Sequence, residues 1–186
     1  MSAVLQRLAE NPAAPEQYSA DVKLHVRLRV FPWISLTLNG NQVYKHPGIY
    51  RFAFRGVPKA AEQFSNMAYA LGDASGWPDK YEIALLPAKP SASAGRDVLR
   101  LTPKVRGLVK YLDVTVDSAT RHIEQIAWSR YDGGTINLTQ HYQTVAAREI
   151  VAQQEASIRI PHMSADLVAN YTNFNVPHAV AAAPER

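Results

Sequence analysis

The chain has 186 residues, no cysteine and a formal net charge of +4 at pH 7. A chain of this length is one domain, and it can bury about 70% of its unfolded surface without disulfides. The absence of cysteine excludes disulfides, thiolate metal sites and cysteine nucleophiles. The lysines and arginines are spread through the sequence and form no run, which favours solvated strand faces over a nucleic-acid-binding patch.

The sequence lacks the usual signals for membrane insertion or export. No apolar run approaches the roughly 18–20 residues that span a bilayer. Met1–Pro12 has no basic start followed by an apolar block, as a secretory leader would. The protein is therefore either cytosolic or has lost a leader, and the residues alone leave both open.

The first predicted elements are a short helix and a long strand. Ser2 can cap a helix over Ser2–Glu10, which Asn11 and Pro12 end. From Tyr18 to Phe31 apolar and polar residues then alternate, so one side of an extended strand is apolar and the other polar. A strand well beyond the usual 5–6 residues needs a large curved antiparallel sheet as its partner. The concave side of such a sheet can hold an apolar ligand.

A β-meander continues this first third. The extended pattern of Trp33–Leu38 leads to Asn39 and Gly40, a pair typical of a hairpin turn. Gln42–Lys45 is predicted to form the antiparallel strand after this turn. Ile49–Arg55 is predicted to form a further strand with its aromatic residues on one side. We therefore expect antiparallel neighbours throughout this segment.

After this third of the chain, the spacing of apolar residues changes from that of a strand to that of an amphipathic helix. Over Val57–Leu71 apolar residues recur at three- and four-residue steps, with Pro58 in the first turn and Gly72 at the end. This apolar stripe must be buried, and the concave face of the sheet is the nearest partner. The pattern predicts a lid-like helix inserted between strands.

The remaining chain is predicted to be mainly strands. The expected strands are Tyr81–Leu86, Asp97–Thr102, Leu108–Asp117, Arg121–Tyr131, Thr135–Val145, Ala156–Ile160 and Asp166–Val176. Phase changes predict a bulge near Glu124 and Gln125, and Ala146–Gln154 is compatible with one or two helical turns. The fold class is α+β and mainly β, an unclosed barrel of about ten antiparallel strands. One domain covers residues 1–176, Pro87–Gly95 forms a linker within it, and a frayed tail covers residues 177–186.

Three phrases of the sequence resemble the LolA-like family of periplasmic outer-membrane lipoprotein carriers and their relatives. They are Asp21–Phe54, Leu108–Val145 and Ser157–Val176, the last ending in a Tyr-x-Asn-Phe-x-Val phrase. The resemblance implies an unclosed antiparallel barrel around helices, an apolar cavity, and transport or sensing of acylated molecules outside the cytoplasm. The functional arginine of the carrier has no matching motif here. The resemblance therefore implies binding of a lipid rather than lipoprotein carriage specifically.

The candidate cavity residues come from the first strand and the inserted helix. They are Val22, Leu24, Val26, Leu28 and Val30 on the strand, and Phe64, Met67 and Leu71 on the helix. Burial of an acyl chain against them would contribute about 0.8 kcal/mol per methylene. A fully packed core would show the same pattern, so both interpretations stay open.

Other candidate sites carry weaker signals. Trp33 and Trp77 stand beside prolines at loop edges, as rim residues would, whereas Trp128 is expected in the core. The six histidines show no metal-binding spacing, so neither metal nor cofactor is expected. Asp113 and Asp117 share one strand face, where solvated charges are a simpler explanation than acid–base catalysis.

Three functions are compatible with these patterns. The first is a monomeric, non-enzymatic binder of a lipid or of the acyl chains of lipoproteins, exported to the bacterial envelope. It would exchange its ligand with a membrane-protein donor or acceptor and would not bind nucleic acid. The second is an envelope sensor or protein-interaction domain with a filled cavity, and the third is a hydrolase that uses the acid pair.

Overall fold

The computed structural model of the protein describes residues 3–9, 15–29, 33–46, 49–55, 74–87 and 95–177. Its helical elements are α1 (Ala3–Ala9), the 3-10 helix η1 (Ala74–Gly76) and α3 (Trp77–Lys80). Its strands are β1 (Gln17–Leu28), β2 (Ser35–Lys45), β3 (Ile49–Phe54), β4 (Tyr81–Leu86), β5 (Arg96–Pro103), β6 (Val109–Asp117), β7 (Ile123–Arg130), β8 (Thr135–Val145), β9 (Arg148–Ile160) and β10 (Met163–Asn175).

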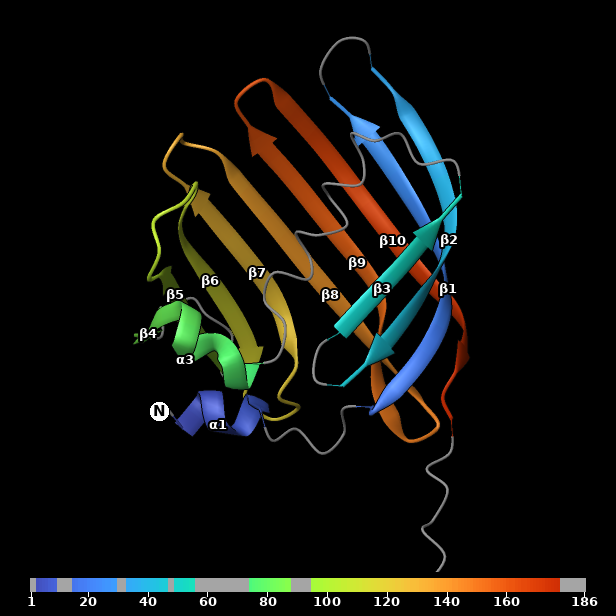
Figure 1. The fold of residues 1–186 in the computed structure, drawn as a ribbon, viewed down its shortest axis with the longest axis horizontal. Coiled ribbons are helices and arrows are strands. Elements are labelled where there is room, and N and C mark those ends of the chain that lie inside the picture. The colour runs from blue at the N-terminus through green and yellow to red at the C-terminus, as the bar shows by residue number, and fades with distance from the viewer. Residues whose placement is uncertain are drawn as a thin grey trace, which may run out of the picture.

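One antiparallel sheet contains all ten of these strands, in the order β3-β2-β1-β10-β9-β8-β7-β6-β5-β4. The sheet is strongly curved, and β3 crosses in front of β8–β10 (Figure 1). The described strands do not close into a barrel, because β3 and β4 remain edge strands and do not pair with each other. The fold class predicted from the sequence, a curved and unclosed antiparallel sheet, is confirmed.

Two apolar clusters cover the inner face of the curve. The main core joins α1, η1 and α3 to strands β5–β10, and Leu99, Leu101 and Val114 are fully buried in it. The second, which we call the aromatic cluster, packs the aromatic side of β3 against β1, β2, β9 and β10. The inner face is thus filled at both ends by side chains that exclude water.

Several local predictions are confirmed. The first helix forms as α1, and the strand over Thr135–Val145 forms as β8 with the same bounds. The bulge lies at Glu124, since Gln125 pairs with Thr115 but Ile123 pairs with Val116. Among the described residues, no helix is both long and apolar enough to traverse a bilayer.

The hairpin predicted at Asn39 and Gly40 is wrong. Both residues lie in the middle of β2, paired with Lys23 and Val22 of β1. The β1 strand ends at Leu28, and the chain returns as β2 from Ser35. Gly40 has a packing reason instead: an added Cβ would lie 2.5 Å from the Ala53 carbonyl oxygen of β3. The glycine therefore permits β3 to approach closely, and close approach of another backbone is a known reason for a glycine within a strand.

The helical turns suggested for Ala146–Gln154 are also wrong. Only Ala146 and Ala147 form the turn, both at positive φ, and β9 begins at Arg148. The whole segment then pairs with β8, up to Arg159 opposite Thr135. Cross-strand pairing therefore overrides the helix propensity of the alanines.

Some predicted segments lie outside the described residues. These are the inserted helix over Val57–Leu71, most of the linker Pro87–Gly95, and all of the tail except Pro177.

Gly40→Ala is expected to lower the free energy of unfolding by about 2–3 kcal/mol, because the new Cβ would overlap the Ala53 carbonyl oxygen and the Phe54 side chain. Urea denaturation measures this loss. Gly107→Ala is the matched control, since a Cβ added there would meet no atom within 4 Å and stability should stay within about 0.5 kcal/mol. Equal stabilities for the two variants would contradict the packing role of Gly40.

Candidate functional site

The apolar row of β1 lies on the inner face and connects the two clusters. Val22 belongs to the aromatic cluster and Leu24 packs against it, whereas Leu28 packs against the main core. Val26 is buried between them but belongs to neither cluster. Val30 lies outside the described residues, as do Phe64, Met67 and Leu71. The four described candidates of β1 therefore share one face, at the junction of the two clusters.

Short side chains lie beside this row. Leu24 and Leu28 pair with Ala169 and Ala165 of β10, and Ala156 of β9 is the next neighbour across from Leu167. We call Ala156, Ala165 and Ala169 the alanine floor. A methyl side chain rises little above the sheet. Ala165 belongs to the main core, against which Ala156 packs, and Ala169 belongs to the aromatic cluster, so the alanine floor lies where the two clusters meet. These three residues were not predicted from the sequence, because their place depends on pairing β9 and β10 with β1.

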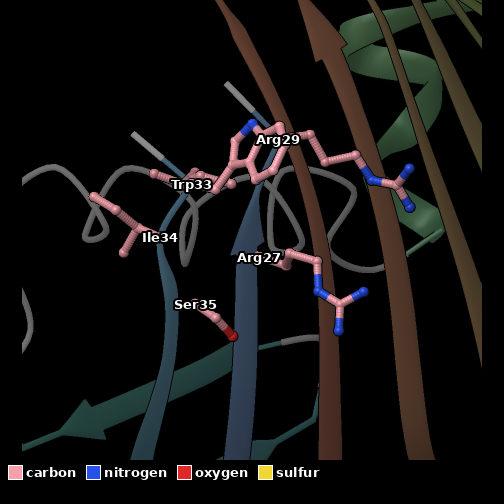
Figure 2. A pocket seen from close by; sticks show the side chains of 6 residues that line it. Arg27, Arg29, Trp33, Ile34 and Ser35 are labelled. Atoms are coloured by element: carbon pink, nitrogen blue, oxygen red, sulfur yellow. The ribbon is translucent and has the colours of Figure 1, made fainter. Parts of the chain in front are cut away.

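A pocket of about 480 Å³ adjoins the end of this row. Its lining residues are Arg27, Leu28, Arg29, Trp33, Ile34 and Ser35, from the end of β1 and the start of β2. Figure 2 shows the guanidinium groups of Arg27 and Arg29 on the same side, with the Trp33 ring beyond the end of β1. Leu28 lines the pocket and also packs against the main core. It therefore links the pocket to the apolar inner face.

Positive charge dominates the pocket. Arg29 and Arg159 both bond to the carboxylate of Asp166, Arg159 at 2.7 Å. Partial burial opposes ionisation of Asp166, but these two arginines outweigh it and lower the pKa of its carboxyl. Arg27 forms no ion pair with another described residue. The pocket thus presents cationic groups beside apolar ones, a combination suited to an anionic amphiphile.

The two tryptophans predicted at a cavity rim differ in their surroundings. Trp33 is 82% exposed and lines the pocket. Trp77 is 1% exposed and packs in the main core together with Leu5 of α1, so in this structure it does not lie at an opening. Trp128 is buried in the same core, as predicted.

The aromatic cluster contains buried polar groups. Tyr18 and Tyr44 lie with ring centroids 5.1 Å apart, and the Gln42 side-chain amide donates to the Tyr18 hydroxyl at 3.1 Å. Burial raises the pKa of Tyr18 and that of Tyr171, so both remain neutral. The Gln42 Oε1 atom is buried and has no hydrogen-bond partner. One acceptor therefore remains unsatisfied within the inner face.

His122 is a partly buried histidine just before β7. Its ring stacks on Tyr142 at 4.0 Å between centroids, and its Nε2 atom lies 3.9 Å from a Glu149 carboxylate oxygen without a hydrogen bond. Burial lowers the pKa of His122, although Glu149, Asp117 and Glu124 raise it in part. No three potential ligands among the described residues form a metal-binding group.

The predicted acid pair has structural partners. Asp113 accepts two hydrogen bonds from the Arg100 guanidinium, both of 2.7 Å. Asp117 accepts from the backbone N–H groups of Ala119 and Thr120 and so fixes the turn after β6. These bonds, with that of Thr120 first, lower the pKa of Asp117. Both carboxylates are therefore engaged in holding the sheet and its turn.

Solved structures with the same fold provide the comparison. A DUF1329 family protein from Desulfovibrio piger superposes with a TM-score of 0.70 at 12% identity, over 96% of this chain and 92% of the other. A predicted outer membrane lipoprotein-sorting protein domain from Vibrio parahaemolyticus gives 0.63 at 10% identity, over 96% and 93%. A LolA superfamily protein from Nitrosomonas europaea gives 0.58 at 10% identity, over 95% and 93%.

These matches confirm the LolA-like fold that the sequence predicted. No protein-family model and no curated protein sequence matches the chain. At 10–12% identity the likeness concerns the fold.

The environment of His122 makes the stability of the fold depend on pH. Because its pKa is lowered in the folded state, the unfolded chain binds the proton first as pH falls. Its contribution to stability is fully present above the ordinary value of about 6.5 and is lost as pH falls toward the lowered pKa, with a slope of at most about 1.4 kcal/mol per pH unit.

Urea denaturation between pH 7.5 and pH 5 should therefore show a loss of stability that His122→Gln reduces. His141→Gln removes an exposed histidine of β8 and is the control, expected to leave the loss unchanged. The same pH dependence in His122→Gln and in the unaltered protein would contradict the effect of burial on this histidine.

Proposed function

We propose that the protein binds a lipid or an acylated ligand, such as the acyl chains of a lipoprotein, on the inner face of its sheet. The apolar chain would lie over the alanine floor, against Leu24 and Leu28, without catalysis or a cofactor. The observation that carries the proposal is the group of short side chains where the two clusters meet, with the pocket beside it at the end of β1. The helix expected over Val57–Leu71 would cover the bound chain.

Burial alone can supply the affinity. Each methylene removed from water contributes about 0.8 kcal/mol, so a chain segment of eight methylenes gives about 6 kcal/mol before entropy losses. The neutral tyrosines and the unpartnered Gln42 acceptor offer a few polar contacts nearby. Such a site is apolar with few polar groups, as is typical of small-molecule sites.

The pocket suggests the direction in which the ligand lies. Leu28 continues the apolar row into the pocket, and Arg27 and Arg29 stand beside it. An amphiphile with its tail on the alanine floor would place its polar end near these arginines. Trp33 would then stand at the mouth.

The shared fold supports this proposal. A LolA superfamily protein and a predicted lipoprotein-sorting domain superpose over nearly the whole chain. By analogy the protein would work in the periplasm, exchanging ligand with a membrane protein, and we propose that it acts as a monomer. The second candidate, a sensor or interaction domain with a filled face, is favoured by the tight burial of the main core.

Ala156→Leu is expected to weaken binding of a fatty acid by roughly 30-fold. The larger side chain would take the place of two or three methylenes of the ligand, a loss of about 2 kcal/mol. Displacement of a fluorescent fatty acid measures the affinity, and native mass spectrometry detects acylated species that copurify with the protein.

Ala84→Leu on β4 makes the same change at an exposed position and serves as the control. It should bind as the unaltered protein does. The urea midpoint of both variants is measured beside the affinity, so that a loss of binding through unfolding is recognised. No binding by the unaltered protein, together with no copurified lipid, would remove the carrier function and leave the sensor.

A further inference from the structure

One end of the sheet carries four hairpins in a row. Leu28 pairs with Ala165, Thr135 with Arg159, and Val109 with Arg130, so the turns that join these strands lie at the same end. In Figure 1 the β9–β10 and β7–β8 turns lie at the upper ends of their strands, and the β5–β6 connection lies to the left of them. We call their described residues the hairpin rim: 29 and 33–34, 104–108, 131–134, and 161–162.

Exposed apolar side chains are concentrated on the hairpin rim. Seven large hydrophobic residues of the described chain are exposed, and five of them lie here: Trp33, Ile34, Val105, Leu108 and Tyr131. The other two, Val43 and Leu85, lie within β2 and β4. Because large apolar side chains at turn tips gain nothing from folding when exposed, their gathering at one end indicates an external contact.

Positive charge accompanies these side chains. Seven cations lie on the hairpin rim or within two residues of it: Arg27, Arg29, Lys104, Arg106, Lys110, Arg130 and Arg159. The carboxylates opposing them are Asp132 on the rim and Asp166, which bonds to Arg29 and Arg159. Seven minus two gives a surplus of five, and the adjoining Asp79, Lys80 and Glu82 reduce it to four. The Arg106 guanidinium lies 5.0 Å from the centroid of the Tyr131 ring, so basic and aromatic groups are in contact.

We propose that the hairpin rim docks onto a bilayer surface that contains anionic phospholipids. Tryptophan and tyrosine prefer the headgroup level of a bilayer, where an apolar ring and a polar edge are both satisfied. Basic residues next to them are drawn to the negative surface potential of anionic lipids. The combination of apolar insertion and charge attraction gives reversible attachment to a surface.

A membrane fits this end better than a protein partner does. The five apolar residues are distributed over three turns, with cations between them, whereas the centre of a protein interface is a contiguous, densely packed patch depleted of charge. The fluid surface of a bilayer accepts side chains that project from several turns in a row. The pocket at Arg27 and Trp33 belongs to the same end, so docking would bring its mouth to the lipid surface.

Cosedimentation with vesicles tests the proposal. The unaltered protein should bind vesicles of phosphatidylcholine mixed with phosphatidylglycerol, and bind pure phosphatidylcholine vesicles about tenfold more weakly. High salt should weaken binding to the mixed vesicles. Trp33→Ser and Leu108→Ser should each reduce the partition coefficient about tenfold, and Arg27→Gln should reduce it on the anionic vesicles alone.

Matched controls come from exposed residues elsewhere. Val43→Ser and Leu85→Ser remove exposed apolar groups away from the hairpin rim, and Arg51→Gln removes an exposed cation of β3. All three should bind vesicles as the unaltered protein does. Equal losses in these controls and in the rim variants would overturn the assignment.

Tryptophan fluorescence locates the contact. Trp77 and Trp128 are 1% and 6% exposed, so lipids with brominated acyl chains should quench Trp33 selectively. Absence of vesicle binding, or binding with Trp33 unquenched, would overturn the proposal, the latter because another surface would hold the membrane. Lipid that appears in the supernatant with the protein reports ligand uptake by the inner face, so the two proposals fail separately.

Discussion

The pairing of β1 with β10 is the constraint on which the rest of the structure depends. It runs from Ser19 opposite Asn175 to Leu28 opposite Ala165 and joins strands from the two ends of the chain. Without this ladder, β1–β3 and β4–β10 would be two separate meanders. The pairing also creates the candidate site, because it alone brings the apolar row of β1 beside Ala165 and Ala169. Pairing of distant segments carries a loop-closure cost that apolar burial on the inner face must offset.

Much of the fold could be predicted from local patterns. Strict alternation predicts β1, and a change of phase locates the bulge at Glu124, since both signals depend on neighbours in sequence. The predictions from sequence were wrong where contacts between residues distant in sequence determine the local structure. Gly40 is a glycine because β3 passes close to it, not because the chain turns there. Alanines after Val145 favour a helix locally, but β8 provides a ladder of partners that requires a strand.

The candidate site was predictable only in part, for the same reason. The apolar row of β1 can be identified from the alternation of residues in the sequence. The alanine floor can be identified only from the register in which β9 and β10 pair with β1. Two tryptophans beside prolines carry the same local signal. Trp77 nevertheless packs in the main core with residues of α1 and η1, whereas Trp33 is exposed. Tertiary contacts therefore bury one of the two tryptophans and leave the other in solvent. Local sequence identifies which side chains could form a rim, and packing determines which of them do.

Side-chain size is what distinguishes the candidate site from the rest of one continuous apolar face. The inner face has the same chemistry from the main core to the aromatic cluster, and large residues interlock at both ends. Where the clusters meet, Ala165 of the main core and Ala169 of the aromatic cluster stand on either side of Leu167 on β10, so short side chains line the junction. An apolar surface with less of its own packing gains more from an added apolar chain than a filled core does. An added apolar chain would therefore lie where the two clusters meet, over the side chains that project least from the sheet.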